Sequence, residues 1–293
     1  MNIYVSNNYN DFDKLNDGIC FQTLNKAIDN INDGDSVFLE NEIYYGKIVI
    51  KNNDIKIYGK DKTIISYDVS HGTKIRDIDK KFFKEKEVYG TTGSASITIK
   101  GNNFFASNVT FQNSYKKEVD EADGQAVALK ITGDNSKFVE CKFLSMQDTL
   151  YVDEIITARF ERCYIEGDID FIFGSGNAIF DNCDIMAKSF DGRSYVTAPS
   201  TLECNEYGFL FYNCKIFTDG CKSYLMRPWY PNREYRYPKV CFIGCYFDEF
   251  IITDIIKMRD YNPDNAILIY NNCIQKDKII SNVDDVSKYL KFI

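Results

Sequence analysis

Phe138-Val139-Glu140-Cys141-Lys142-Phe143 is the stretch of sequence that decides the fold. It is one copy of an internal repeat in which an aromatic residue precedes a cysteine by three positions. The sixth copy fits less well, because Gln275 stands where the others have Phe or Ile. Copies recur at intervals of 20 to 31 residues, which indicates stacked units rather than one closed core. The six pairs are Phe138/Cys141, Phe160/Cys163, Phe180/Cys183, Phe211/Cys214, Phe242/Cys245 and Tyr270/Cys273.

Short segments with alternating apolar and polar side chains surround these repeats. Residues 47–50, 54–58 and 96–99 are rich in β-branched residues, and Gly, Asn or Asp separates such segments. We therefore predict an all-β fold, a parallel β-helix (solenoid) that forms a single domain over residues 1–293. Apolar faces near residues 21–31 and 283–293 predict short helices that cap the two ends of the coil.

Cysteine is frequent and histidine is rare: the chain has ten Cys, one His and no Cys-x-x-Cys pair. A small apolar thiol suits a buried ladder inside the coil, so we predict core thiols, with disulfides or metal ligation as the alternatives. Cysteines without an evident pairing scheme favour a reducing compartment. We expect a cytoplasmic protein, or else a secreted one whose signal peptide is absent from this chain.

The charge balance limits the partners. With 35 Lys and Arg against 43 Asp and Glu, the net charge is −8, and a nucleic-acid partner requires a basic surface instead. No stretch is long and apolar enough to span a membrane. We expect neither a nucleic-acid nor a membrane partner. We also expect the protein to be a monomer.

Two carboxylates are the best candidates for chemistry. His71 is the only imidazole and lies in a polar loop without a nucleophile motif. Asp148 and Asp170 each follow a repeat cysteine, Cys141 or Cys163, by seven residues. If the repeats stack, these carboxylates are neighbours about 4.8 Å apart on adjacent coils. Two acids that close, among apolar neighbours, cannot both ionise easily, so one can donate a proton while the other attacks.

Further polar residues suit such a pair. Gln125 opens an otherwise apolar strand and Gln147 precedes Asp148, and side-chain amides are good donors to an oxyanion. The guanidinium of Arg227 could pair with one carboxylate and keep it charged. Trp229, the only tryptophan, is either a core residue or part of a binding cleft.

Six segments together resemble the pectin methylesterase family, the carbohydrate esterases that demethylate pectin. The segments occur in the family's order and at similar spacing, and the resemblance extends from about the first strand to Cys245. They are Gly90–Ser94, Gln125–Leu129, Gln147–Tyr151, Asp170–Gly174, Tyr195–Pro199 and Leu225–Trp229.

The resemblance implies a right-handed parallel β-helix and a role for each site residue. Asp170 matches the nucleophile that attacks the C6 methyl ester of galacturonate, and Asp148 matches the general acid and base. Gln125 and Gln147 match the oxyanion donors, and Arg227 matches the residue that orients the nucleophile. No metal or organic cofactor is implied, and the implied partner is methylated homogalacturonan or its oligomers. The substrate cleft is matched by Thr91, Tyr151, Phe173, Arg227 and Trp229.

The sequence departs from the family pattern at three positions and leaves other functions open. Met226 replaces a usual Gly and could crowd Arg227, Asp168 could add a carboxylate to the cleft, and Ile255 replaces a cleft Trp of many members. A polygalacturonase-like glycoside hydrolase would also use two Asp about 5 Å apart. A calcium-dependent polysaccharide lyase and an inactive carbohydrate-binding solenoid are further alternatives.

Overall fold

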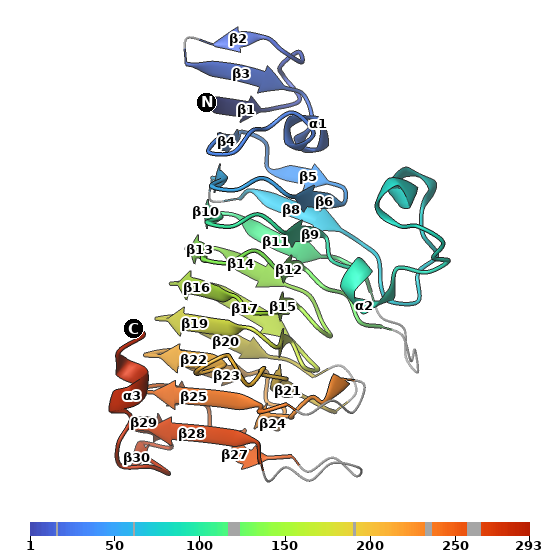
Figure 1. Cartoon of the computed structure of the whole chain (residues 1–293). Coiled ribbons are helices and arrows are strands. Elements are labelled where there is room, and N and C mark those ends of the chain that lie inside the picture. The colour runs from blue at the N-terminus through green and yellow to red at the C-terminus, as the bar shows by residue number, and fades with distance from the viewer. Residues whose placement is uncertain (16, 61, 117–123, 190–191, 232–235, 257–264) are drawn as a thin grey trace.

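The chain winds into stacked coils that contribute strands to three long sheets (Figure 1). The computed structural model describes residues 1–293 except 16, 61, 117–123, 190–191, 232–235 and 257–264. Strands of successive coils pair in parallel throughout, and the two antiparallel pairs among the described strands lie at the ends of the molecule. The predicted parallel β-helix is therefore confirmed.

Sheet A carries the aromatic position of the repeat, and its inward-facing side chains alternate with outward-facing ones. In order along the sheet its strands are β2 (Lys14–Leu15), β3 (Gly18–Phe21), β1 (Asn2–Val5), β4 (Ser36–Leu39), β7 (Lys56–Tyr58), β10 (Phe105–Ser107), β13 (Ser136–Val139), β16 (Thr157–Glu161), β19 (Asn177–Asp181), β22 (Phe209–Tyr212), β25 (Lys239–Ile243) and β28 (Ile267–Asn271).

Sheets B and C complete each coil. Sheet B consists of β5 (Ile43–Tyr45), β8 (Ile64–Tyr67), β11 (Thr110–Asn113), β14 (Lys142–Leu144), β17 (Tyr164–Gly167), β20 (Asp184–Ala187), β23 (Lys215–Thr218), β26 (Tyr246–Phe247), β29 (Cys273–Gln275) and β30 (Lys278–Ile280). Sheet C consists of β6 (Ile48–Ile50), β9 (Ile97–Ile99), β12 (Leu129–Ile131), β15 (Leu150–Val152), β18 (Ile172–Gly174), β21 (Tyr195–Pro199), β24 (Ser223–Met226) and β27 (Ile251–Ile255).

The repeat phenylalanines form one stacked column in the core. Successive ring centroids from Phe138 through Phe160, Phe180 and Phe211 to Phe242 are 5.1, 4.8, 4.4 and 4.6 Å apart, and the rings are nearly parallel. All five side chains are fully buried. These distances are close to the strand spacing of about 4.8 Å, so the register of the coils itself brings the rings into contact.

The repeat cysteines lie at the turn from sheet A to sheet B. The residue before each Cys has a left-handed backbone, as in Glu140 (φ 54°) and Asn182 (φ 53°), and this conformation turns the chain between sheets. The thiols then stack inside the coil, where the thiol of Cys183 donates to the carbonyl of Phe160 (3.3 Å). All ten cysteines lie in the described residues and are free thiols. Eight are buried, which confirms the predicted core thiols for these eight, whereas Cys204 is exposed and Cys221 is half-buried.

The helices are few and short. α1 (Leu24–Ile28) packs Leu24, Ala27 and Ile28 into the main core near the first coil, as the sequence predicts for an N-terminal cap. The other helices are the 3₁₀ helix η1 (Asp77–Phe82), α2 (Gly90–Gly93) and α3 (Ser287–Leu290). No helix among the described residues is both long and apolar enough to cross a bilayer.

The C-terminal helix differs from the prediction in where it packs. Val286 and Tyr289 contact Leu210, Cys241 and Ile243, which are outward-facing residues of sheet A. α3 therefore covers the outer face of that sheet beside β19 to β28 instead of closing the open end of the coil (Figure 1). The apolar pattern correctly predicts a buried face, but it cannot tell an end of the coil from an apolar side of it.

Candidate active site

Asp148 and Asp170 occupy the same place on consecutive coils. β15 and β18 pair with Leu150 opposite Ile172, and each aspartate lies two residues before its member of that pair. The amide of Asp148 donates to the carbonyl of Ile169 (3.0 Å), so the two turns that lead from sheet B to sheet C are stacked directly. Both side chains line one cavity of about 370 Å³ at sheet C.

This cavity also collects the other residues singled out in the sequence. Three lining residues were not predicted, Thr92, Ala198 and Pro228, although each lies within or beside a segment that carries the family resemblance. The register of β18 with β21 places Ala198 opposite Phe173, which is a pairing that the repeat spacing alone does not reveal. The predicted residues that line the cavity are Thr91, Gln125, Gln147, Asp148, Tyr151, Asp170, Phe173, Arg227 and Trp229.

Arg227 holds Asp170 with a two-pronged contact. Its Nε donates to Asp170 Oδ1 (2.8 Å) and its Nη2 donates to Asp170 Oδ2. The guanidinium carbon lies 4.3 Å from the centre of the Tyr195 ring, and the amide of Arg227 donates to the carbonyl of Thr197 (2.8 Å). Because the guanidinium is fixed by the ring on one side and the carboxylate on the other, it fixes the orientation of Asp170.

Burial and Arg227 act on the ionisation of Asp170 in opposite directions. The side chains of Arg227 and Asp170 are only 22% and 16% exposed. Burial raises the pKa of the Asp170 carboxyl above its ordinary value, while the hydrogen bonds and positive charge of Arg227 lower it, and burial prevails. Arg227 therefore stabilises the charged form of Asp170, which burial disfavours.

The two glutamines reach the cavity from neighbouring coils. The amide of Ala126 donates to the carbonyl of Gln147 (3.0 Å), which ties their two segments together. Gln125 Oε1 is buried and has no hydrogen-bond partner within the described part of the chain. A side-chain amide in that state at a cavity wall can turn toward a bound ligand.

Three aromatic rings form one side of the cavity. Tyr151 and Phe173 stack with centroids 4.3 Å apart, and the Trp229 ring lies at a steep angle 5.9 Å from Phe173. Trp229 is partly buried against this small cluster, which is separate from the main core of the coil. Trp229 therefore lines the cavity and lies outside the main core of the coil.

The three departures from the family pattern all lie outside the cavity lining. Met226 is fully buried in the main core, and Ile255 pairs with it across β24 and β27. Asp168 is 1% exposed, and its Oδ1 accepts from the amide of Ile169 (2.6 Å). The suggestions that Met226 crowds Arg227 and that Asp168 adds a cleft carboxylate are wrong, because both side chains turn into the protein.

The single histidine, His71, contacts two residues of the cavity wall. His71 Nδ1 lies 3.0 Å from Thr91 Oγ1, and the backbone amide of His71 donates to the carbonyl of Gln125 (2.8 Å). His71 itself is not among the lining residues. Among the described residues, no group of three or more His, Cys, Asp or Glu side chains is arranged to hold a metal ion.

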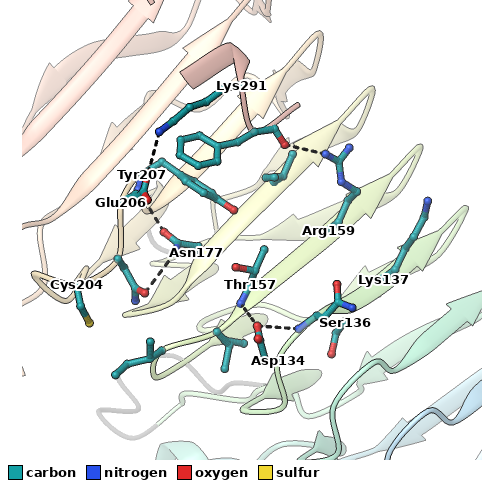
Figure 2. A pocket seen from close by; sticks show the side chains of 16 residues that line it. Asp134, Ser136, Lys137, Thr157, Arg159, Asn177, Cys204, Glu206, Tyr207 and Lys291 are labelled. Atoms are coloured by element: carbon teal, nitrogen blue, oxygen red, sulfur yellow. Dashed lines mark hydrogen bonds and ion pairs between the residues drawn. The ribbon is translucent and has the colours of Figure 1, made fainter. Parts of the chain in front are cut away.

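A larger cavity, of about 630 Å³, lies on the outer face of sheet A (Figure 2). Its charged groups are already engaged. Arg159 Nη2 donates to the carbonyls of Phe292 (2.9 Å) and Ile293 (3.0 Å), and Lys291 pairs with Glu206 (3.2 Å). Asp134 accepts from the amide of Thr157 (2.7 Å). These contacts attach the C-terminal segment to sheet A. The candidate active site is therefore the cavity at sheet C, which brings Asp148, Asp170 and Arg227 together.

Comparison with known proteins assigns the family. The family model described as Pectinesterase matches residues 15–273. The chain belongs to the pectinesterase family. Pectinesterase A of Dickeya dadantii is 32% identical over 290 residues, which cover 89% of this chain and 75% of that protein. Pectinesterase 31 of Arabidopsis thaliana is 40% identical over 145 residues, but the match covers 48% of this chain and 43% of that protein.

Solved structures agree with the pectinesterase assignment. A crystal structure of pectin methylesterase in complex with a hexasaccharide superposes with a TM-score of 0.80 at 25% identity, covering 98% of this chain and 94% of that one. Pectin methylesterase from Yersinia enterocolitica gives a TM-score of 0.79 at 27% identity, covering 92% of this chain and 96% of that one. The family resemblance seen in the sequence is therefore confirmed.

Proposed function

We propose that this chain is a pectin methylesterase that hydrolyses the C6 methyl esters of galacturonate units and releases methanol. The observation that supports this most is the pairing of Asp148 with Asp170 on consecutive coils at one cavity, with Arg227 fixed on Asp170. The names of its relatives agree with this activity, and one structural neighbour was solved with a hexasaccharide, which supports an oligosaccharide substrate.

In the first step, the ionised Asp170 attacks the ester carbonyl carbon. The carbonyl oxygen becomes an oxyanion, to which the side-chain amides of Gln125 and Gln147 donate. When the tetrahedral intermediate collapses, the C–O bond to the methoxy group breaks. Asp148 gives its proton to that oxygen, and methanol leaves. The galacturonate acyl group is then joined to Asp170 as an anhydride.

In the second step, Asp148 acts as a base. It takes a proton from a water molecule, whose oxygen attacks the acyl carbon of the intermediate. The bond to Asp170 breaks, and the galacturonate leaves with a free carboxyl group. Asp148 again holds the proton and Asp170 is again charged. Arg227 keeps Asp170 ionised and oriented, so that each cycle starts from the same state.

The glycoside hydrolase alternative remains the main competitor, because a close pair of aspartates also fits a retaining glycosidase. The two amides at the cavity favour the esterase, since an acyl oxyanion needs donors and a departing glycosidic oxygen needs only the acid. Methanol release and new reducing ends should be measured in parallel on the same methylated oligogalacturonides. We expect methanol alone, and we expect Asp170→Ala to abolish it. New reducing ends without methanol would reject the esterase.

The cellular location and the oligomeric state of the enzyme are also part of the proposal. Ten free thiols suit a reducing compartment, so we propose a cytoplasmic enzyme that acts as a monomer on methylated oligomers. Cell fractionation of the native source with an antibody to this chain tests the location, and light scattering of the purified chain tests the monomer.

A further inference from the structure

Lys47 is a buried lysine that lies directly before β6, the first strand of sheet C. Only 4% of it is exposed, although lysine is seldom buried without a carboxylate partner. Its Nζ donates to the carbonyls of Gly93 and Ala95, 2.5 Å in each case. The same atom lies 5.5 Å from the centres of the Phe83 and Tyr89 rings. Burial lowers the pKa of Lys47 to about 8, so the amine is mostly protonated at neutral pH and both hydrogen bonds are charge-assisted.

Both of these carbonyls belong to the wall of the active-site cavity. Gly93 ends α2, which carries the cavity residues Thr91 and Thr92. Ala95 belongs to the small apolar cluster that contains the aromatic rings of the cavity. Lys47 therefore connects the segment with the two threonines to the aromatic side of the same cavity.

The segment that ends in α2 lies apart from the three sheets. Residues 68–96 leave the coil after β8 and return to it at β9, and the β-bridge inside this segment joins Lys74 to Val88 (Figure 1). The contact of His71 Nδ1 with Thr91 Oγ1 (3.0 Å) and the bond from the His71 amide to the Gln125 carbonyl (2.8 Å) join α2 to the rest of the cavity. A shift of α2 would therefore change the surroundings of Thr91 and of His71.

Lys47 reaches α2 from a fixed position. Its carbonyl accepts from the side-chain amide of Asn25 in α1 (2.9 Å), and the next residue begins β6. The Tyr89 ring beside the ammonium is also held, because its hydroxyl donates to the buried carboxylate of Asp79 (2.5 Å). The backbone of Lys47 and the surroundings of its ammonium are thus both anchored, so the side chain can set the distance between β6 and α2.

Stability alone does not explain a charge in this place. An ammonium loses its hydration when it is buried, and replacing a buried charge with an apolar side chain of similar size is often neutral or stabilising. Methionine has nearly the length of lysine and would fill the same space without that cost. The charge of Lys47 is explained by what its two hydrogen bonds do to α2 and Ala95.

We propose that Lys47 is a positioning residue for the ester hydrolysis, which holds α2 and Ala95 in place and so sets where Thr91 and Thr92 contact the sugar. The inference rests on the proposed function, because it assigns a task in that reaction to a residue outside the cavity. Lys47 is not among the residues that line the cavity, so it acts through the backbone carbonyls that it binds.

The variant Lys47→Met distinguishes this role from a purely structural one. We expect kcat/KM for methanol release to fall about 10- to 100-fold, mainly through a higher KM, because a displaced α2 no longer fits the sugar. We expect the midpoint of denaturant unfolding to stay the same or to rise. Lys47→Arg keeps the charge and the donors and should retain more activity than Lys47→Met. The control is Phe180→Leu in the main core, which should lower the midpoint while the folded enzyme keeps its kcat and KM.

His71 provides a measurement that needs no turnover, because it is the only histidine in the chain. Its ring contacts Thr91, so the Cε1–H signal of ¹³C-labelled histidine in an NMR spectrum reports the position of α2. We expect this signal to move in Lys47→Met, to move less in Lys47→Arg, and to stay in place in Phe180→Leu.

Four results would overturn the proposal. They are an unchanged kcat/KM in Lys47→Met, an unchanged His71 signal in that variant, failure of the variant to fold, and a lower unfolding midpoint that accounts for the whole loss of activity. The two proposals can fail separately. If the wild type releases no methanol, the proposed esterase fails, whereas the His71 signal still decides whether Lys47 positions α2.

Discussion

Asp148 and Asp170 share a left-handed backbone conformation, with φ of 65° and 53°, at matching positions of consecutive coils. Residues other than glycine seldom adopt this conformation, which costs about 1 to 3 kcal/mol, although aspartate tolerates it better than most. The hydrogen bond from the Asp148 amide to the Ile169 carbonyl holds the two turns in register. The same unusual turn thus points both carboxylates toward one cavity.

Loss of Arg227 should move the pH dependence of the enzyme. Activity requires ionised Asp170, so it falls as pH drops through the pKa of this carboxyl, which burial already raises. Removing the positive charge in Arg227→Gln raises that pKa further. The acid limb of kcat/KM should move upward by about 1 to 3 pH units. An Arg227→Lys variant should shift it less, and an unchanged acid limb in both variants would contradict the role assigned to Arg227.

Each oxyanion donor should contribute to the rate more than to binding. Gln147→Ala should lower kcat by about 10² to 10³-fold with little change in KM, because the oxyanion exists only in the transition state. Gln125→Ala should behave alike, and Gln→Glu at either position should be at least as harmful, since a second negative charge would face the oxyanion. Initial rates of methanol release over a range of substrate concentrations give both constants. An increase in KM with kcat unchanged would contradict the role of these glutamines as oxyanion donors.

The aromatic side of the cavity should act mainly in binding. Trp229→Ala removes a ring packed 5.9 Å from Phe173 and should raise KM about tenfold while kcat changes little. Trp229→Phe should restore part of the affinity. The matched control is Tyr246→Ala, which removes an exposed ring on sheet B. If kcat fell instead and KM stayed constant, Trp229 would be positioning the reacting groups.

The phenylalanine column should dominate the stability of the coil. Phe180 stacks between Phe160 and Phe211, so Phe180→Ala leaves a cavity between two rings and should cost about 3 to 5 kcal/mol of unfolding free energy. Phe180→Leu should cost less. Denaturant titration measures both values, and the folded fraction should keep its activity because Phe180 is remote from the cavity lining. A loss below about 1 kcal/mol would contradict the role of the column in holding the coils together.

The fold was predictable because a repeat in the sequence becomes a repeat in space. Phe138 and Phe160 had to stack once the coils were in register, and the same register placed Asp148 next to Asp170. The turn residues were harder to predict, because Glu140 and Arg162 adopt left-handed backbone conformations that residues of these types seldom adopt. The single-domain boundary, residues 1–293, stays a prediction.

What the sequence could not predict was the direction of individual side chains and the packing of non-repeating segments. Asp168 lies two residues from Asp170, yet its carboxylate is buried outside the cavity lining, where its Oδ1 accepts from the amide of Ile169. The C-terminal helix has the predicted apolar face, but it covers sheet A. A second groove along sheet C combines residues from β6 and β9 with residues from the segment around η1, so no local pattern in the sequence predicts it. Such features depend on contacts between segments that share no repeat.

The most direct test of the account is methanol release from methylated oligogalacturonides by the wild type, Asp148→Asn, Asp170→Asn and the double variant. Asp184→Asn, an exposed aspartate on β20, is the control, and thermal melting verifies that each variant folds. Because the two acids act as one unit, each single change should lower kcat by about 10⁴-fold or more, and the double change should be no worse than either alone. Near-normal methanol release by either single variant would contradict the mechanism in which Asp148 and Asp170 act together.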